Sequence, residues 1–471
     1  MLFSIYVIIN YMCSFLVTSK DINSKDLEKA NFYQKLRGPD LTNIFKQHGV
    51  TFVHNLLSIT GLFTKQPFVD MEHDIVCIFN GEIYNYKTFS DKYTSDGECL
   101  IPCYLKHGET FFKQLDGEFA IVLIDFKNNK IIFGSDTFGT KPIFFSFENE
   151  SYGMSTYESC LKILGFKQVH RVYGNYFYIA DTNKKSLSLH RVTEFDLDNE
   201  YKKDFNDWNA AFERSILKRA NNVDKKVFIG LSEGFDSGTI CTSLLKNNLN
   251  FKAFSVNVKT PPSNVLLWRH GTATKPLPVV ENIQIETPNI IDKEYMNLSF
   301  KELKEIKDSI YSLCEDYRYF YFDEGKFKSR VCRETYGFLG AGAIFSKAKK
   351  EGYKICLSGL AGDIIGNKNI NQLFKKLNDI NGVIDFDDNN IYSCEFCCGL
   401  HGLEVRYPYL DKEVWQETLW LDKNIYQHFK QPQRQYMLAN KFPFVDIDNQ
   451  GKEIFEKVGF YKPLPTWFFK I

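Results

Sequence analysis

The sequence of 471 residues lacks an excess of charge of either sign, because lysine and arginine together number 58, as do aspartate and glutamate. This balance gives no support for a nucleic-acid partner or for binding to an acidic membrane. The only membrane candidate, residues 1–11 (MLFSIYVIINY), is too short to span a bilayer, and it lacks the basic segment and cleavage site of a signal peptide. We therefore expect neither nucleic acid nor a membrane among the partners.

Regularly spaced cysteines are also lacking, since the 12 cysteines are scattered along the chain. Without a secretory context, a chain of this size is expected to be a reduced, cytoplasmic protein. Cys394, Cys397 and Cys398 come closest to a metal-binding pattern, but no second cysteine pair or histidine set follows at the usual distance. A cluster of buried thiols is therefore favoured over a zinc site.

One stretch predicts an anion site. Val227–Leu231 is an apolar run typical of a buried strand, Ser232–Ser237 is a loop of mostly small residues, and Thr239–Leu245 reads as a helix. Backbone N–H groups at a helix N-terminus favour anions, although an ordinary strand-to-helix turn is the alternative. The stretch lacks the Gly-Lys-Ser/Thr ending of a Walker loop and the spacing of a dinucleotide fingerprint.

The following segment places this loop at the edge of a parallel sheet. Phe251–Val256 reads as a second strand, which completes a βαβ unit with helices on the faces of its sheet. Ligands of such sheets bind beyond the carboxyl ends of the strands, where the loop lies. Residues 257–300, which include Pro261-Pro262, are expected to be irregular and to form a mobile loop.

The loop resembles the Ser-Gly-Gly-x-Asp-Ser motif of asparagine synthetases and other ATP pyrophosphatases. In that family the loop holds the β,γ-pyrophosphate of ATP while a substrate carboxylate attacks the α-phosphate. Glu233 departs from the motif, because it brings a carboxylate where phosphate should approach. The resemblance implies that ATP binds at the loop and at the second strand, whose backbone frames the adenine: Leu231, Ser232, Gly234, Asp236, Ser237 and Val256.

A second signature of the same family follows a predicted helix, Arg333–Lys350. Tyr353–Asp363 resembles a strand followed by Ser-Gly-Glu-Gly-x-Asp-Glu, which implies ATP binding by Ser358 and Gly359. Asp236 and Asp363 are then the oxygen ligands of a Mg²⁺ ion on the pyrophosphate. The alternative for Asp363 is a helix N-cap.

Two carboxylates of this signature are missing. Leu360 replaces a glutamate that lies near the acyl-adenylate in the family, and Ile364 replaces the glutamate after the aspartate. A lost carboxylate can neither accept a proton nor orient an amine. Either Glu233 or Glu315-Asp316 compensates, or the acceptor is no longer aspartate.

The N-terminal half begins with a different chemistry. Met12-Cys13, followed by a strand-like run, resembles the start of class II glutamine amidotransferases. In that family, loss of the initiator methionine leaves a cysteine whose thiol is the nucleophile and whose α-amine, with a pKa of about 8, is the base. Residues 1–11 would block this amine, so we expect translation to begin at Met12 or the extension to be removed. A buried structural cysteine is the alternative.

Further motifs of the amidotransferases follow in the order of that family. The resemblance implies that the Asn80 side chain and the Gly81 N–H form an oxyanion hole. It also implies that Glu82 and Asp96 bind the amino group of glutamine. The matching segments are Arg37–Asp40, Gln66-Pro67, Asn80–Asn85, Ser95–Glu98, Leu115–Ala120 and Asp136–Pro142, with a predicted hairpin turn at Asn128-Asn129.

One amidotransferase residue is absent. Leu56 stands where the family has an arginine that clamps the α-carboxylate of glutamine. A bidentate arginine–carboxylate pair is among the stronger hydrogen-bonded contacts in proteins. Glutamine is therefore expected to bind weakly unless another cation substitutes.

Three segments near the C-terminus complete the resemblance. His401–Asp411 is similar to a family segment that packs beneath the ATP site, and Lys430–Arg434 is similar to its Lys-x-x-Leu-Arg segment. The family also has a lysine that neutralises charge at the α-phosphate, which we assign to Lys457, with Lys452 as a rival by spacing. A solvated surface lysine is the alternative for both.

The length predicts two or three domains. We expect an α/β protein with residues 1–11 as an extension or misassigned start, 12–190 as an αββα Ntn-type amidotransferase domain, 191–206 as a linker, and 207–471 as an α/β parallel-sheet ATP-pyrophosphatase domain. An amphipathic helix at Asp207–Arg219 leads into the second domain.

The resemblance implies a glutamine-dependent asparagine synthetase, with ATP and Mg²⁺ as cofactors and with glutamine and aspartate as substrates. Cys13 releases ammonia, which displaces AMP from an aspartyl adenylate and gives asparagine. Three alternatives stay open: amidation of a different carboxylate, an internal cyclisation (disfavoured by Cys13), and a non-catalytic paralogue with a binding or regulatory role. A homodimer is left open as well.

Overall fold

The computed structural model describes residues 13–38, 40–220, 226–258, 264–272, 277, 279–280, 282–313, 322–323, 326–327, 336–367, 369–370, 390–428 and 430–444. The chain divides into two compact units between Thr193 and Glu194. Leu313–Lys328 and Cys398–Glu404 are grouped with the first unit, and the rest of the chain with the second. None of the described helices is long and apolar enough to cross a membrane.

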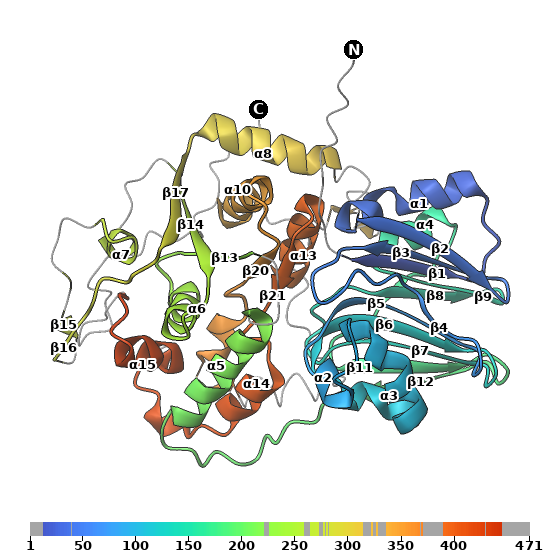
Figure 1. The fold of residues 1–471 in the computed structure, drawn as a ribbon, viewed down its shortest axis with the longest axis horizontal. Helices are drawn as coiled ribbons and strands as arrows, with labels where there is room; N and C mark the ends of the chain where they lie inside the picture. Colours follow the sequence, from blue (N-terminus) through green and yellow to red (C-terminus); the bar gives the residue numbers. More distant parts are fainter. Residues whose placement is uncertain are drawn as a thin grey trace. The chain divides into compact units, whose positions relative to one another are not determined.

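The first unit contains two six-stranded sheets, in which all registered pairs are antiparallel. One sheet has the order β10-β8-β9-β1-β3-β2, and the other has the order β12-β11-β7-β6-β5-β4 (Figure 1). The strands are β1 (Ser14–Thr18), β2 (Leu41–Gln47), β3 (Val50–Leu56), β4 (Phe68–Asp70), β5 (Ile75–Ile83), β6 (Gly117–Asp125), β7 (Lys130–Ser135), β8 (Phe144–Glu148), β9 (Ser151–Ser155), β10 (His170–Arg171), β11 (Tyr176–Asp181) and β12 (Ser186–Arg191).

Helices cover the outer face of each sheet. The helices α1 (Ser24–Arg37) and α4 (Glu158–Ile163) pack on the first sheet, and α2 (Tyr86–Phe89) and α3 (Leu100–His107) lie on the second (Figure 1). The 3₁₀ segments η1 (Asp96–Cys99) and η2 (Gly108–Gln114) flank α3. The predicted four-layer αββα arrangement is therefore confirmed.

Strand β5 explains why this unit needs four layers. Val76 and Ile78 belong to the core between the sheets, whereas Ile75, Cys77 and Phe79 belong to the core beneath α3. Successive side chains of a strand point to opposite faces, so both faces of this strand are buried. A strand covered on both sides appears in the sequence as an unbroken apolar run.

The second unit is built on a five-stranded sheet with the order β17-β14-β13-β20-β21 (Figure 1). The registers of β13 with β14, β13 with β20 and β14 with β17 are parallel, as predicted. The strands are β13 (Val227–Gly230), β14 (Phe251–Val258), β17 (Asp292–Leu298), β20 (Ile355–Leu357) and β21 (Glu404–Arg406), and β15 (Val279–Val280) pairs with β16 (Ile283–Gln284) in a separate hairpin. The hairpin of β18 (Phe322–Asp323) with β19 (Lys326–Phe327) lies in the segment that is grouped with the first unit.

Helices flank this sheet on both sides. Helix α10 packs on β13 and β14 (Figure 1). Helix α6 packs on β13, and α5 and α15 pack against α6. The predicted helix before the first strand is α5. The helices are α5 (Asn206–Ala220), α6 (Phe235–Lys246), α7 (Asn264–Arg269), α8 (Phe300–Leu313), α10 (Tyr336–Lys350), α11 (Gly362–Ile365), α13 (Asn390–His401), α14 (Lys412–Leu419) and α15 (Gln431–Ala439), with the 3₁₀ segment η3 (Lys423–Ile425).

The prediction that residues 257–300 are irregular is wrong. The short helix α7 lies in this stretch and buries Val265 and Trp268, which are three residues apart on one face. Strand β17 also lies there, at the edge of the sheet, and has no fully buried side chain. An edge strand without buried residues gives no apolar alternation, so the sequence carried little signal for it.

Candidate active sites

Cys13 lies directly before β1, where its side chain meets the backbone that follows β3. The N–H of Leu57 donates to Cys13 Sγ at 3.2 Å, and Sγ lies 3.5 Å from the Leu57 carbonyl oxygen. Arg37 is fully buried, and its Nε donates to the Cys13 carbonyl oxygen at 3.2 Å. Asp40 accepts the Ser58 N–H at 3.0 Å. The Arg-Gly-Pro-Asp motif thus fixes the backbone on both sides of the thiol.

Asn80 presents a buried donor with no partner. Its side chain is 2% exposed, and among the described residues its Nδ2 has no hydrogen-bond partner. Such a group costs about 1–3 kcal/mol unless a ligand satisfies it. The adjacent Gly81 has φ +131°, and a Cβ there would lie 1.9 Å from the Glu118 carbonyl oxygen, so only glycine fits. A buried, unpartnered donor is what the predicted oxyanion hole requires, and the role of this pair stays a prediction.

The two predicted glutamine-binding carboxylates belong to the same neighbourhood. Asp96 accepts the N–H of Ile83 at 2.9 Å, so the 3₁₀ segment η1 is tied to the end of β5 that carries Glu82. Burial raises the pKa of the Cys13 thiol well above its usual range, and the charges of Glu404, Glu82 and Asp96 raise it further. The structure therefore brings these segments together around Cys13, and the thiol needs a base to ionise.

Leu56 is buried at the end of β3, at 6% exposure. A cation that replaces the family's arginine is not apparent among the described neighbours of Cys13, since Arg37 is held by the Cys13 carbonyl and by the Tyr157 hydroxyl. The expectation of weak glutamine binding remains a prediction.

In the second unit, the predicted pyrophosphate loop is closed by its own hydroxyl groups. The Ser232 N–H donates to Ser237 Oγ at 3.0 Å, the two serine hydroxyls are 2.9 Å apart, and the Gly234 N–H donates to Ser232 Oγ at 3.1 Å. Helix α6 begins at Phe235, earlier than the predicted start at Thr239. Asp236 and Ser237 therefore lie in its first turn, at the positive end of the helix dipole.

The two strands beside the loop hold it in place. The Leu231 N–H donates to the Phe254 carbonyl at 2.7 Å, and Ser255 Oγ donates to the Leu231 carbonyl at 2.6 Å. Val256, the predicted adenine contact, is the next residue of β14 and is buried. The loop is thus anchored at the carboxyl end of β13, as predicted for a ligand site.

The second signature approaches Asp236 through glycines. A Cβ on Gly362 would lie 2.2 Å from Asp236 Oδ1, and a Cβ on Gly359 would lie 3.0 Å from Asp236 Cβ. Ser358 Oγ accepts the Leu360 N–H at 3.3 Å and so shapes this turn. The structure therefore brings Ser358, Gly359 and Asp236 together. The Tyr409 hydroxyl donates to the Asp236 carbonyl at 3.0 Å, in keeping with a supporting role for His401–Asp411.

A lysine lies between the two predicted metal ligands. Lys430 Nζ is 2.5 Å from Asp236 Oδ2 and 2.5 Å from Asp363 Oδ1. Burial lowers the pKa of this ammonium group, but the two carboxylates outweigh burial and hold the pKa above its usual value. Asp363 lies in the first turn of α11, where Ala361 rather than Asp363 is the N-cap. Sequence reasoning noted the Lys430 segment but gave this side chain no role.

Arg269 is a further residue that the sequence reasoning missed. It ends α7, is fully buried, and its NH1 donates to the carbonyl oxygens of Ser232 and Gly234, the latter at 3.1 Å. Its Nε donates to the Pro443 carbonyl oxygen at 2.9 Å. Burial lowers the pKa of Arg269 to about 10, so the guanidinium stays charged at neutral pH. Its segment carries no motif that could have singled it out.

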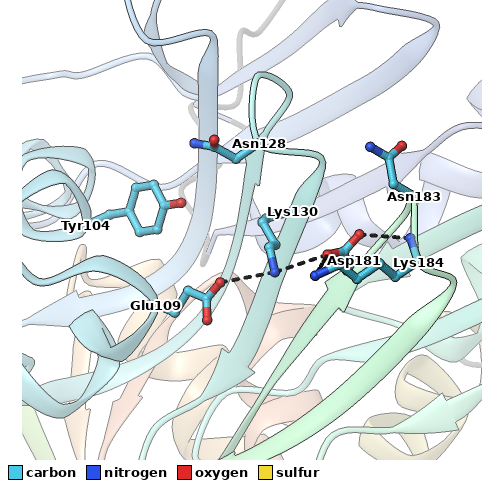
Figure 2. A pocket seen from close by; sticks show the side chains of 7 residues that line it. All are labelled: Tyr104, Glu109, Asn128, Lys130, Asp181, Asn183 and Lys184. Carbon is cyan, nitrogen blue, oxygen red and sulfur yellow. Dashed lines mark hydrogen bonds and ion pairs between the residues drawn. The ribbon is translucent and has the colours of Figure 1, made fainter.

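The first unit also has a polar cavity of about 460 Å³ that is distinct from the Cys13 site (Figure 2). Lys130 lies between Glu109 and Asp181, at 3.3 Å from each, and Lys184 is 3.7 Å from Asp181. Strand register places it at the Ile75 end of the second sheet, opposite the end that carries Asn80–Ile83. Its charged groups pair with one another, and no predicted site residue lines it.

Several predictions fall on residues outside the described part of the chain. These are the extension and Met12, the catalytic Lys457 and its rival Lys452, and the acidic pair Glu315-Asp316. Among the described residues, no group of three or more histidine, cysteine or acidic side chains could hold a metal ion, and Cys397 and Cys398 are buried. A metal at Asp236 and Asp363 would need ligands from its substrate or from water.

The first unit is similar to a known domain family. Residues 12–196 match the family model of the glutamine amidotransferase domain. The chain is 25% identical over 413 residues to the putative asparagine synthetase (glutamine-hydrolysing) 1 of Methanocaldococcus jannaschii, which covers 79% of this chain and 69% of that protein. It is 23% identical over 472 residues to the probable asparagine synthetase (glutamine-hydrolysing) of Schizosaccharomyces pombe. The aligned residues are 92% of this chain and 80% of that protein.

Other similarities are more partial. The mouse asparagine synthetase (glutamine-hydrolysing) is 29% identical over 251 residues, which span 45% of this chain and 44% of that protein. Among solved structures, the glutamine phosphoribosylpyrophosphate amidotransferase of Bacillus subtilis aligns with 66% of this chain and 94% of its own, at 11% identity and a TM-score of 0.34.

Proposed function

We propose that this protein is an ATP-dependent carbon–nitrogen ligase with glutamine as nitrogen donor, because residues 12–196 match a glutamine amidotransferase domain and the chain is similar to glutamine-hydrolysing asparagine synthetases. The first unit releases ammonia from glutamine. The second unit activates the β-carboxylate of aspartate with ATP, and ammonia displaces AMP. The products are asparagine, AMP, pyrophosphate and glutamate.

The observation that carries the amidotransferase half is the convergence of distant motifs on one thiol. Cys13 is held by Leu57, and its pKa responds to the carboxylates of Glu82 and Asp96. Glu82 and Asp96 are two of the three carboxylates whose charges disfavour the Cys13 thiolate, so their placement is not explained by the thiol itself. They suit a site that receives the positively charged amino group of glutamine.

The roles of the individual groups follow from their positions. The α-amine of Cys13, once free, takes the thiol proton, and Sγ attacks the amide carbon of glutamine. The unpartnered Nδ2 of Asn80 and the Gly81 N–H then stabilise the negative oxygen of the tetrahedral intermediate. Ammonia leaves, and water releases glutamate from the thioester.

The synthetase half rests on the loop Ser232–Ser237 and on the turn at Ser358 and Gly359. The loop binds the pyrophosphate portion of ATP at the N-terminus of α6, and the backbone at Val256 borders the adenine. Lys457 is proposed to neutralise charge that develops at the α-phosphate. Substrate carboxylate attacks at the α-phosphorus, and its oxygen displaces pyrophosphate.

Asp236 and Asp363 fit Mg²⁺ in charge and ligand type, because their oxygens converge on the single cationic position that Lys430 Nζ reaches. Magnesium is commonly held by one or two carboxylates, with substrate phosphates and waters completing its shell. When bound, the ion would neutralise charge on the pyrophosphate. Lys430 Nζ occupies this position in the structure, so an ion held by both carboxylates would have to displace the ammonium group.

A second function, amidation of a different carboxylate, is favoured by the side chains at three positions. Leu360 provides no carboxylate where the family has a glutamate near the acyl-adenylate, and Glu233 changes the phosphate loop. Leu56 replaces the arginine that binds the α-carboxylate of glutamine in the family. The non-catalytic alternative predicts that Mg-ATP does not bind.

A reducing compartment such as the cytoplasm is proposed for this protein. The described cysteines, 10 in number, are all free thiols. Free buried thiols such as Cys77, Cys99 and Cys103 do not require an oxidising compartment.

Glutamine labelled with ¹⁵N in its amide tests the proposal as a whole. Protein that begins at Cys13 is incubated with the labelled glutamine, Mg-ATP and aspartate, and the products are identified by mass spectrometry. The proposal predicts ¹⁵N-asparagine with equal amounts of AMP. Label that appears in another amide identifies the alternative acceptor, and unlabelled glutamate release without AMP limits the activity to the first unit. The Cys13→Ala protein is the matched control.

A further inference from the structure

A buried arginine supports the predicted phosphate loop from beneath. Arg269 comes from the end of α7, and its guanidinium reaches the carbonyls of Ser232 and Gly234 on one side and of Pro443 on the other. The first turn of α6 makes room for it, because a Cβ on Gly238 would lie 2.5 Å from Arg269 NH2. The loop, α6, α7 and the segment after α15 therefore meet at one cation.

The direction of these hydrogen bonds fixes the orientation of the loop. In a trans peptide the C=O and the next N–H point to opposite sides. Arg269 holds the Ser232 and Gly234 carbonyls toward the interior, so the N–H groups of Glu233 and Phe235 face away from it. The loop's remaining donors turn inward, since the Ser232 and Gly234 N–H groups bond to Ser237 and Ser232 hydroxyls. The outward side of the loop is thereby a donor surface.

Charge adds a second effect. Glu233 brings a carboxylate into a loop that is proposed to receive pyrophosphate, and this charge opposes phosphate binding. The Arg269 guanidinium donates to the carbonyl oxygens of Ser232 and Gly234, the two residues on either side of Glu233. In a buried setting a fixed positive charge is weakly screened by solvent, so it offsets the carboxylate above it.

We propose that Arg269 is a positioning residue of the pyrophosphate loop, which orients its N–H groups outward and offsets the negative charge of Glu233. This role rests on the proposed function, because it assumes that the loop binds the phosphates of ATP. It adds a residue from α7 that belongs to neither of the two signature motifs.

Binding of pyrophosphate and of adenosine to the full chain separates this role from a purely structural one. Both ligands are titrated by calorimetry in the presence of Mg²⁺. In Arg269→Gln, the dissociation constant for pyrophosphate is expected to rise about tenfold to a hundredfold, the range of a lost charge-assisted hydrogen bond. Adenosine binding is expected to stay within threefold of wild type, because the guanidinium faces the loop and not β14. Unfolding of the site as a whole would weaken both ligands equally.

Matched variants keep the test decisive. Arg269→Lys retains the charge but not the two-carbonyl geometry, so it is expected to bind pyrophosphate more weakly than wild type and more tightly than Arg269→Gln. If Arg269→Gln does not fold, the comparison of Arg269→Lys with wild type still tests the role. Arg219→Lys changes another buried arginine of the unit, which pairs with Asp411, and is expected to leave pyrophosphate binding unchanged. Glu233→Gln should tighten pyrophosphate binding more in Arg269→Gln than in wild type, because the carboxylate is no longer compensated by a positive charge there.

The outcomes distinguish the two levels of the argument. If wild type binds pyrophosphate and a folded Arg269→Gln or Arg269→Lys binds it equally well, the role of Arg269 is overturned while the proposed function stands. If wild type binds neither pyrophosphate nor Mg-ATP, the proposed function fails and the role of Arg269 fails with it. Equal loss of adenosine and pyrophosphate binding in a folded Arg269→Lys would also overturn it, in favour of a structural role.

Discussion

Replacing Asn80 by alanine should abolish most of the glutaminase activity while leaving the fold intact. The Asn80 side chain is 2% exposed, and its Nδ2 has no partner among the described residues. Burying an unsatisfied donor costs about 1–3 kcal/mol in the free enzyme. That cost is recovered only when an oxyanion forms beside the donor, so the interaction belongs to the transition state.

The expected effects on kcat and on the free energy of unfolding can be estimated separately. Loss of one oxyanion-hole donor costs about 2.7–4 kcal/mol, or about 10²–10³ in kcat. The free energy of unfolding should change by no more than about 1–2 kcal/mol, because deletion of the unsatisfied amide offsets part of the lost packing. The loss should therefore fall on kcat for glutamine hydrolysis and not on stability or on the ammonium-dependent reaction.

Steady-state glutamate release, urea denaturation and ammonium-dependent AMP formation measure these three quantities. Asn80→Asp is the isosteric comparison, in which a carboxylate repels the oxyanion and the loss should be at least as large. A kcat within threefold of wild type in Asn80→Ala would refute the assignment. A loss of more than about 3 kcal/mol in unfolding free energy would instead mean that the side chain has a structural role.

Three further predictions concern other residues. Leu56→Arg should lower KM for glutamine about tenfold to a hundredfold in the glutaminase assay by supplying a carboxylate partner, and Leu56→Met should not. Gly81→Ala should lower the unfolding free energy by about 3 kcal/mol or more in urea, because φ is +131° and the new Cβ would lie 1.9 Å from the Glu118 carbonyl oxygen. Burial lowers the pKa of His270 to about 4, below the unfolded value of 6.5. Between these two pH values the unfolded chain binds one more proton than the folded chain. The free energy of unfolding therefore falls as the pH drops from about 6.5 to 4. His270→Gln should reduce this slope by up to about 1.4 kcal/mol per pH unit, measured by urea denaturation across that range.

Local patterns predicted the parts of the molecule that local physics decides. The apolar run at Val227–Leu231 and the small-residue loop after it were sufficient to predict β13, the turn and a following helix. The four-layer amidotransferase fold was expected from the resemblance, which rests on a series of motifs between Arg37 and Pro142. The signal for β13 and the turn after it lies within about ten neighbouring residues.

Contacts between distant segments left no such signal. Lys430 meets Asp236 across 194 positions in the sequence, and Arg269 meets the Ser232 carbonyl across 37. A guanidinium that binds backbone carbonyls requires no particular residue at the other end, so no pairing pattern marks it. Strand β17 was missed for a related reason, since an edge strand buries too little to show a period of two.

The central claim is that the second unit adenylates aspartate, and excess ammonium tests it without the glutamine site. Protein beginning at Cys13 is incubated with Mg-ATP, aspartate and ammonium, and nucleotides and amino acids are read by mass spectrometry. The account predicts AMP and asparagine in equal amounts, with no AMP when aspartate is omitted. ATP that binds but yields no AMP with aspartate would contradict the account and leave another carboxylate as the acceptor.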